Sequence, residues 1–293
     1  MDARLDVVHD RLVVGFDGSD HARSAVRWAA IEAGRRRAAV RVVGSYGAVS
    51  VVDSYGISGG QAAGEETEQH RLSCLNALTE LTAEQAHLHP AVGFDVDASA
   101  ERPARALVAA GRDADLVVVG TSGTGPVRQF LLGSVVAEVL HDSLCPVAVV
   151  GAHVPERIAR VVVAADGSDC AQDALVWATE EAARWDAELV VFHAWDYPYR
   201  LTETSFERGC DIVRIDAALL VEQAVAVARE RYVGPVSGLV AEGGAVQCLL
   251  DESERADLLV LGSRGRGGFR SMLFGSVAHA VTTRSVCPVV VTR

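Results

Sequence analysis

The sequence has no segment that marks a membrane or exported protein. Its first residues, MDARLDVVHDR, lack the basic start, the apolar run and the small-residue cleavage site of a signal peptide. No apolar run reaches the roughly 18 residues that a membrane-spanning helix needs. We therefore expect a cytoplasmic protein that does not associate with membranes.

The chain also lacks an excess of basic residues. Its 27 Lys and Arg residues stand against 39 Asp and Glu residues, which gives a formal net charge of -12. A protein that coats nucleic acid needs a basic surface. We expect no nucleic-acid partner, although the arginines of SRGRGGFR, residues 263–270, form a small local basic site.

Recognisable catalytic and metal-binding motifs are missing too. The sequence contains no HExxH motif and no kinase-like catalytic loop. Its six cysteines include no CxxC pair, so they indicate reduced, mostly buried thiols rather than disulfides or a zinc knuckle. His87 and His89 precede Pro90, which is more typical of a solvated helix end than of a metal site. We predict neither catalytic residues nor metal-ligating side chains.

What the chain does contain is an internal repeat. VVGFDGS returns as VVAADGS, so that Asp166 follows Asp17 by 149 positions (166 - 17). Gly262 follows Gly120 by only 142 positions (262 - 120). The first repeat is therefore longer than the second, and we place its extra residues in the Gly- and Ser-rich segment 47–66. The chain has 293 residues. We predict two domains, residues 1–152 and 153–293.

Each repeat alternates strand-like and helix-like segments. The strand segments are short, β-branched and almost continuously apolar, as strands covered on both faces are. Between them, a segment such as 20–35 places alanines on one helical face after Ser19, a suitable N-cap. This alternation predicts an α/β fold of two tandem doubly wound, Rossmann-like domains, each with a five-stranded parallel sheet. In such sheets ligands bind beyond the carboxyl ends of the strands.

The strongest junction of this kind follows the fourth predicted strand of each repeat. Glycines and one serine recur there at identical spacing: Gly120, Gly123, Gly133 and Ser134 in the first repeat, and Gly262, Gly265, Gly275 and Ser276 in the second. Glycines permit close backbone approach, and a helix N-terminus suits an anion such as phosphate. The spacing is neither that of a P-loop nor that of a Rossmann fingerprint. The alternative is that these residues form only a tight turn and a helix start.

On these motifs the sequence resembles a tandem universal stress protein of the ATP-binding type, whose hallmark is G-x2-G-x9-G-[ST] after the fourth strand. The Asp-Gly-Ser after the first strand and the closing Cys-Pro-Val segments match as well. The resemblance implies that the last strands of the two halves pair antiparallel and so join the halves. It also implies ATP as the ligand, accompanied by Mg²⁺ held mainly by phosphate oxygens and water, and it is compatible with a homodimer.

The resemblance further implies which residues bind ATP. Those near the ends of the first two strands of each half would face adenosine: Gly15, Asp17, Ser45, Ala164, Asp166 and Ala194. Others would surround the ribose and the phosphates: Gly120, Thr121, Ser122, Gly123, Thr124, Gly125, Arg128, Gly133, Ser134, Val135, Gly262, Ser263, Arg264, Gly265, Arg266, Gly267, Arg270, Gly275, Ser276 and Val277. An aspartate at the end of the first strand also suits a helix cap, and the two roles are compatible.

The two repeats differ in charge around the expected phosphates. The second repeat has Arg264, Arg266 and Arg270, whereas the first has only Arg128, at the position of Arg270. If the arginines turn inward, the second site has the higher phosphate affinity; the alternative is that they are solvated surface side chains. We therefore predict two unequal ATP sites.

We expect a nucleotide-dependent regulator or sensor in stress response and growth control. Any hydrolysis would be weak, because no residue is evidently placed to orient water or to neutralise a transferring phosphoryl group. Two alternatives stay open: a slow ATPase on the same scaffold, and a nucleotide-free interaction protein. These residues do not identify the downstream protein partner.

Overall fold

The computed structural model describes residues 11–47, 62–121, 132–196, 203–266 and 274–293, with the backbone alone for 62–66 and 203–209. Contacts divide the chain into two compact units, and the main division lies between Cys145 and Pro146. This division precedes the predicted boundary at residue 152, so the strand that follows Pro146 lies with the second unit.

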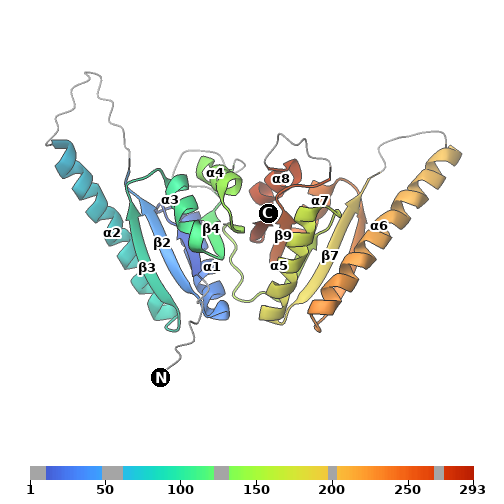
Figure 1. The fold of residues 1–293 in the computed structure, drawn as a ribbon, viewed down its shortest axis with the longest axis horizontal. Coiled ribbons are helices and arrows are strands. Elements are labelled where there is room, and N and C mark those ends of the chain that lie inside the picture. The colour runs from blue at the N-terminus through green and yellow to red at the C-terminus, as the bar shows by residue number, and fades with distance from the viewer. Residues whose placement is uncertain (1–10, 48–61, 122–131, 197–202, 267–273) are drawn as a thin grey trace, which may run out of the picture. The chain divides into compact units, whose positions relative to one another are not determined.

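The first unit contains a parallel sheet whose strands lie in the order β3-β2-β1-β4 (Figure 1). Its elements are β1 (Arg11–Gly15), α1 (Asp20–Arg36), β2 (Ala39–Ser45), α2 (Ala62–Leu88), β3 (Gly93–Ser99), α3 (Pro103–Ala110), the short 3-10 helix η1 (Gly111–Asp113), β4 (Leu116–Gly120) and α4 (Ser134–Asp142).

The second unit repeats this arrangement and adds two strands, in the order β5-β10-β9-β6-β7-β8. Its elements are β5 (Val147–Val150), β6 (Arg160–Ala164), α5 (Asp169–Trp185), β7 (Glu188–Trp195), α6 (Glu203–Arg231), β8 (Val236–Glu242), α7 (Ala245–Ser253), β9 (Leu258–Gly262), α8 (Ser276–Arg284) and β10 (Val289–Thr292). β10 pairs parallel with β9 and antiparallel with β5, with Val290 opposite Ala148.

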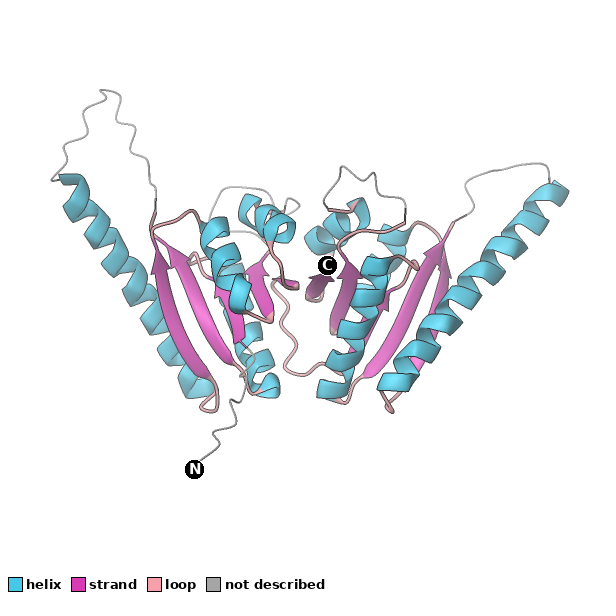
Figure 2. Ribbon diagram, viewed as in Figure 1, coloured by secondary structure: helices cyan, strands magenta, loops and turns pink. Residues whose placement is uncertain are grey.

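The predicted fold class is confirmed: the sheets are mostly parallel, and the two closing strands form the antiparallel pair. In the second unit α5 packs beside α6, and α7 packs beside α8, so that helices cover the sheet in two layers (Figure 2). The right-handed crossovers of a doubly wound sheet produce these two layers. Within the described residues, no helix has the length and apolarity needed to cross a membrane.

Helices α1 and α5 begin in the same way, as their sequences predict. The hydroxyl of Ser19 accepts a hydrogen bond from the Ala22 amide at 3.1 Å, and that of Ser168 accepts one from the Ala171 amide at 3.3 Å. Such N-caps satisfy first-turn N–H groups that have no partner inside the helix. The cap fixes where each helix starts relative to the strand before it.

The buried face of α5 consists mainly of alanines, and this lets the helix lie close to the sheet. Ala174, Ala178 and Ala182 are fully buried, and α5 contacts both β6 and β9. At the end of β9 the approach is closest: a Cβ added to Gly262 would lie 2.7 Å from the carbonyl carbon of Cys170. In the first unit, a Cβ added to Gly120 would likewise lie 2.7 Å from the carbonyl carbon of His21 in α1. These glycines are needed for a close backbone contact.

We predict that Gly262→Ala destabilises the second unit by about 1–3 kcal/mol, the usual cost of forcing extra atoms into a packed site. The matched control is Gly151→Ala, where an added Cβ has no atom within 4 Å, and whose effect should stay within about 0.5 kcal/mol. Urea unfolding measures both. Equal midpoints for the two variants would contradict the packing argument.

All six cysteines lie in the described residues and are free thiols, but only Cys287 is buried. The prediction of mostly buried cysteines is therefore wrong for the other five, which are partly exposed. Burial raises the pKa of the Cys287 thiol to about 11.

Cys287 should resist thiol reagents in the folded protein at pH 8, because the reactive form is the thiolate and its pKa lies far above this pH. Mass spectrometry after brief labelling should find Cys287 unmodified while the partly exposed Cys248 reacts first; both should react in denaturant. Labelling of Cys287 at the rate of Cys248 in the folded state would show that it is not shielded.

Candidate functional site

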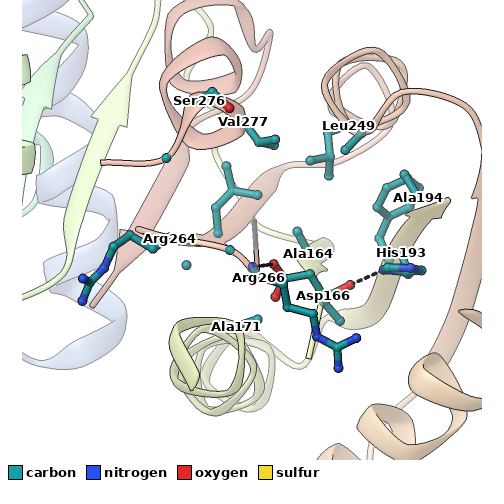
Figure 3. A pocket seen from close by; sticks show the side chains of 17 residues that line it. Ala164, Asp166, Ala171, His193, Ala194, Leu249, Arg264, Arg266, Ser276 and Val277 are labelled. Carbon is teal, nitrogen blue, oxygen red and sulfur yellow. Dashed lines mark hydrogen bonds between the residues drawn. The ribbon is translucent and has the colours of Figure 1, made fainter. Parts of the chain in front are cut away.

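The carboxyl ends of β6, β7 and β9 and the N-termini of α7 and α8 surround a cavity of about 440 Å³ in the second unit (Figure 3). This volume lies in the range of small-molecule sites. Most of the residues predicted for the second domain line it: Ala164, Asp166, Ala194, Gly262, Arg264, Gly265, Arg266, Gly275, Ser276 and Val277.

Three predicted residues of this domain are not seen in the cavity wall. Ser263 is buried, and its backbone amide donates to the Thr292 carbonyl oxygen at 2.7 Å. Its hydroxyl lies 3.9 Å from the Cys170 sulfur, so the side chain packs toward α5. Gly267 and Arg270 lie outside the described residues.

The Asp166 carboxylate joins the start of α5 to the loop after β9. Its Oδ1 accepts from the Ser168 amide at 2.9 Å and from the Ser168 hydroxyl at 2.6 Å. Its Oδ2 accepts from the Arg266 amide at 3.0 Å. Asp166 therefore holds the turn before α5 and also the loop that lines the cavity, whereas the cap of the helix itself is Ser168.

The loop after β9 is closed at its base by a backbone hydrogen bond, in which the Gly275 amide donates to the Ser263 carbonyl oxygen at 2.9 Å. Within it, a Cβ added to Gly265 would lie 2.4 Å from Asp166 Oδ2. Residue 265 must therefore lack a side chain for the loop backbone to reach the carboxylate. In the first unit the Gly133 amide donates to the Thr121 carbonyl oxygen at 3.2 Å, which closes that loop at the equivalent place.

Helix α8 presents its N-terminus to the cavity. Gly275 is its N-cap residue and supplies no side chain to bond the first-turn amides. Ser276 and Val277, the first two residues of the helix, line the cavity. Unbonded first-turn N–H groups together with the helix dipole favour an anion at this end.

Part of the wall is apolar, and the sequence analysis did not predict it: Ala165, Ala171, Phe192, Ala245, Leu249 and Leu261. His193 also lines the cavity, and its Nδ1 lies 2.6 Å from the Ala165 carbonyl oxygen, to which it can only donate. This hydrogen bond joins His193 to the residue that follows β6. Phe192 and His193 lie near the end of a predicted strand, on the sheet edge where ligands bind, and this position could have identified them as cavity residues.

The two described arginines of the loop are exposed. The guanidinium of Arg266 lies against Gly167 at the entrance to α5, where an added Cβ would be 2.1 Å from one of its nitrogens. Arg264 extends from the loop in a different direction (Figure 3). Both side chains border the cavity without filling it.

The first unit presents the corresponding residues at the ends of β1, β2 and β4. Asp17 Oδ1 accepts from the Ser19 amide at 3.0 Å, as Asp166 does from Ser168. The Ser45 hydroxyl donates to the carbonyl oxygen of Glu101, a contact that Ala194 cannot make. Five predicted residues of this domain lie outside the described part of the chain: Ser122, Gly123, Thr124, Gly125 and Arg128.

The fold and the site together define a class: a tandem, doubly wound α/β protein with a small-molecule cavity at the carboxyl edge of a sheet. Comparison with known proteins identifies the family within this class. The model of the universal stress protein family matches residues 9–151 and 157–293. The chain therefore belongs to the universal stress protein family, and both of its halves are members.

Curated relatives have the same tandem length. A universal stress protein of Mycobacterium tuberculosis is 31% identical over 296 aligned positions, which cover 96% of each chain. One of Mycolicibacterium smegmatis is 32% identical with the same coverage. These relatives confirm the resemblance on which the sequence interpretation was based.

Solved structures agree on the fold. A universal stress protein of Archaeoglobus fulgidus has a TM-score of 0.69 at 21% identity, over 97% of this chain and 98% of that one. A putative universal stress protein of Pseudomonas aeruginosa has a TM-score of 0.61 at 17% identity, over 98% and 93%. At these identities the likeness concerns the fold.

We expect Asp166→Ala to lower the free energy of unfolding by about 1–3 kcal/mol, because three donors lose their shared acceptor. The control is Asp173→Ala, an exposed position in α5, for which a change within about 0.5 kcal/mol is expected. Chemical denaturation followed by circular dichroism measures both. If both variants unfold at the same denaturant concentration, the carboxylate does not hold the loop.

Proposed function

We propose that this chain binds ATP with Mg²⁺ at one site in each domain, and that it acts in the cytoplasm as a nucleotide-dependent regulator of stress response and growth. The observation that carries the proposal is the cavity of the second unit, because its two ends suit the two parts of a nucleotide. One end is apolar, and the other joins glycines, a helix N-terminus and two arginines.

The apolar end suits adenosine. Phe192 and Leu249 provide apolar walls, and Ala194 leaves space between strand and helix for a flat base. Asp166 Oδ2 accepts one hydrogen bond within the protein, and a carboxylate oxygen can accept a second. We infer that this oxygen accepts from a ribose hydroxyl or from the adenine amino group.

The other end suits the phosphates. The first-turn amides of α8 and the exposed Ser276 hydroxyl supply neutral donors, and Arg264 and Arg266 supply charge after a rotation of their exposed side chains. No group of three His, Cys, Asp or Glu residues among those described could hold a metal ion by itself. Mg²⁺ would therefore be held mainly by phosphate oxygens and water.

The same residues favour binding over hydrolysis. Among the described residues that line the cavity, Asp166 is the only carboxylate. Both of its oxygens already accept hydrogen bonds from the Ser168 and Arg266 backbone. A general base must be close to the attacking water and able to take its proton, and a carboxylate committed to holding a loop is poorly suited to this. A slow ATPase is therefore the less favoured function.

A two-ligand titration tests the proposal. In the double variant Arg264→Gln with Arg266→Gln, we expect the second site to bind ATP at least about tenfold more weakly, because charged hydrogen bonds contribute about 1.5–3 kcal/mol each. Its affinity for adenosine should stay unchanged. Ala194→Phe should weaken both ligands, because the ring fills the adenosine end.

The control is Arg284→Gln, which removes one charge at the far end of α8, where the side chain is exposed. Isothermal titration calorimetry in the presence of Mg²⁺ measures each affinity. An equal loss of ATP and adenosine binding in the arginine variant, or no loss in any variant, would contradict the proposed orientation.

A further inference from the structure

The second unit contains another cavity, a groove of about 610 Å³ between α5 and α6. It lies along residues 171–176 of α5 and residues 216–231 of α6. It shares Ala165, Ala171 and Arg266 with the cavity beside Asp166, and its other lining residues lie outside that cavity. Its volume is within the range of small-molecule sites.

Apolar side chains form part of the wall of this groove, and two of them are exposed to solvent. Leu219 is 49% exposed and Val227 is 43% exposed, and Leu175, Val176 and Leu220 complete the wall. A single exposed apolar side chain is ordinary, but several lining one concave surface mark a binding site.

The internal repeat shows whether the fold itself requires these side chains. The faces of α2 and α6 that pack on the sheet define the register between the two helices. Leu78 and Gln85 of α2 are buried, as are Val221 and Ala228 of α6, each 143 positions later (221 - 78 and 228 - 85). Equivalent positions of the two helices are therefore 143 apart.

In this register the first unit has polar residues at three of the apolar positions of the groove. Asn76 is equivalent to Leu219, and Glu84 is equivalent to Val227. Both Asn76 and Glu84 are exposed. At the offset of 149 that applies to α1 and α5, Val176 corresponds to Arg27. The fold is therefore built once without apolar side chains at these three positions, so Val176, Leu219 and Val227 need another explanation.

The charges at the two ends of the groove differ. Arg231 lies at one end, is exposed, and makes no hydrogen bond or ion pair with another described residue. It stands where the first unit has Leu88. Arg266 and Asp216 also line the groove, so its other charged residues include both signs. An anionic group is therefore favoured at the Arg231 end.

We propose that the groove binds a small amphipathic carboxylate, with its apolar chain against Leu219 and Val227 and its carboxylate beside Arg231. From residue 216 to residue 231 the helix extends about 22 Å at the usual rise per residue, which accommodates an alkyl chain of the fatty-acid kind. The site does not depend on the proposed nucleotide function, since Leu219, Val227 and Arg231 do not line the other cavity.

Calorimetry with dodecanoate, kept below the concentration at which it forms micelles, tests this proposal on the full chain. The wild-type protein should bind one dodecanoate per chain. Val227→Glu and Leu219→Asn, which install the residues of the first unit, should each weaken binding about tenfold or more. Arg231→Gln should weaken dodecanoate several-fold but leave dodecyltrimethylammonium, with the same tail and opposite charge, unaffected.

The matched control is Asn76→Leu, which adds the same apolar side chain at the equivalent position of the first unit and should leave dodecanoate affinity unchanged. Thermal melts establish that each variant is folded, and Leu219→Asn serves if Val227→Glu does not fold. Absence of binding to the wild-type chain, or wild-type affinity in folded groove variants, would overturn the proposal. Equal affinity for the two probes would overturn the assignment of a carboxylate. Unchanged ATP titrations in these variants would show that the two sites are separate.

Discussion

The contact between the first turn of α5 and the last residue of β9 is the constraint on which the second unit depends. The helix reaches the strand only because Gly262 has no side chain, since an added Cβ would lie 2.7 Å from backbone atoms of Cys170. With α5 held there, Asp166 can accept hydrogen bonds from both the helix entrance and the loop after β9. The cavity at the carboxyl edge of the sheet follows from these two connections.

The duplication separates what the fold needs from what the sites add. Both units have a glycine against the first turn of a helix, an aspartate that accepts from a serine amide, and a closed loop before the next helix. The side chains around these shared features have diverged: Ser45 donates to Glu101 where the second unit has Ala194. One backbone plan therefore supports sites of different chemistry. It also supports a groove on α6, where Leu219 and Val227 stand at the positions that are polar in α2.

Much of the fold and part of the candidate site were predictable from the sequence, because short-range patterns of residues determine them. Continuous apolar runs predicted buried parallel strands, and the repeated glycine spacing located the loop at the strand ends. The apolar wall was missed, since Phe192 and Leu249 are ordinary core residues by type and only the packing of α7 against β7 brings them together. The direction of the arginines was also beyond prediction, because exposed side chains are not positioned by packing; Arg266 lies against Gly167.

The central claim is that the cavity beside Asp166 holds an adenine nucleotide through its base, ribose and phosphates. The most direct measurement is to denature the purified protein and to identify any released small molecule by chromatography and mass spectrometry, then to repeat this after incubation with ATP and Mg²⁺ and removal of free nucleotide. The account predicts ATP, with up to two molecules released per chain. Release of no nucleotide in either experiment, or of a ligand without an adenosine and phosphate part, would contradict it.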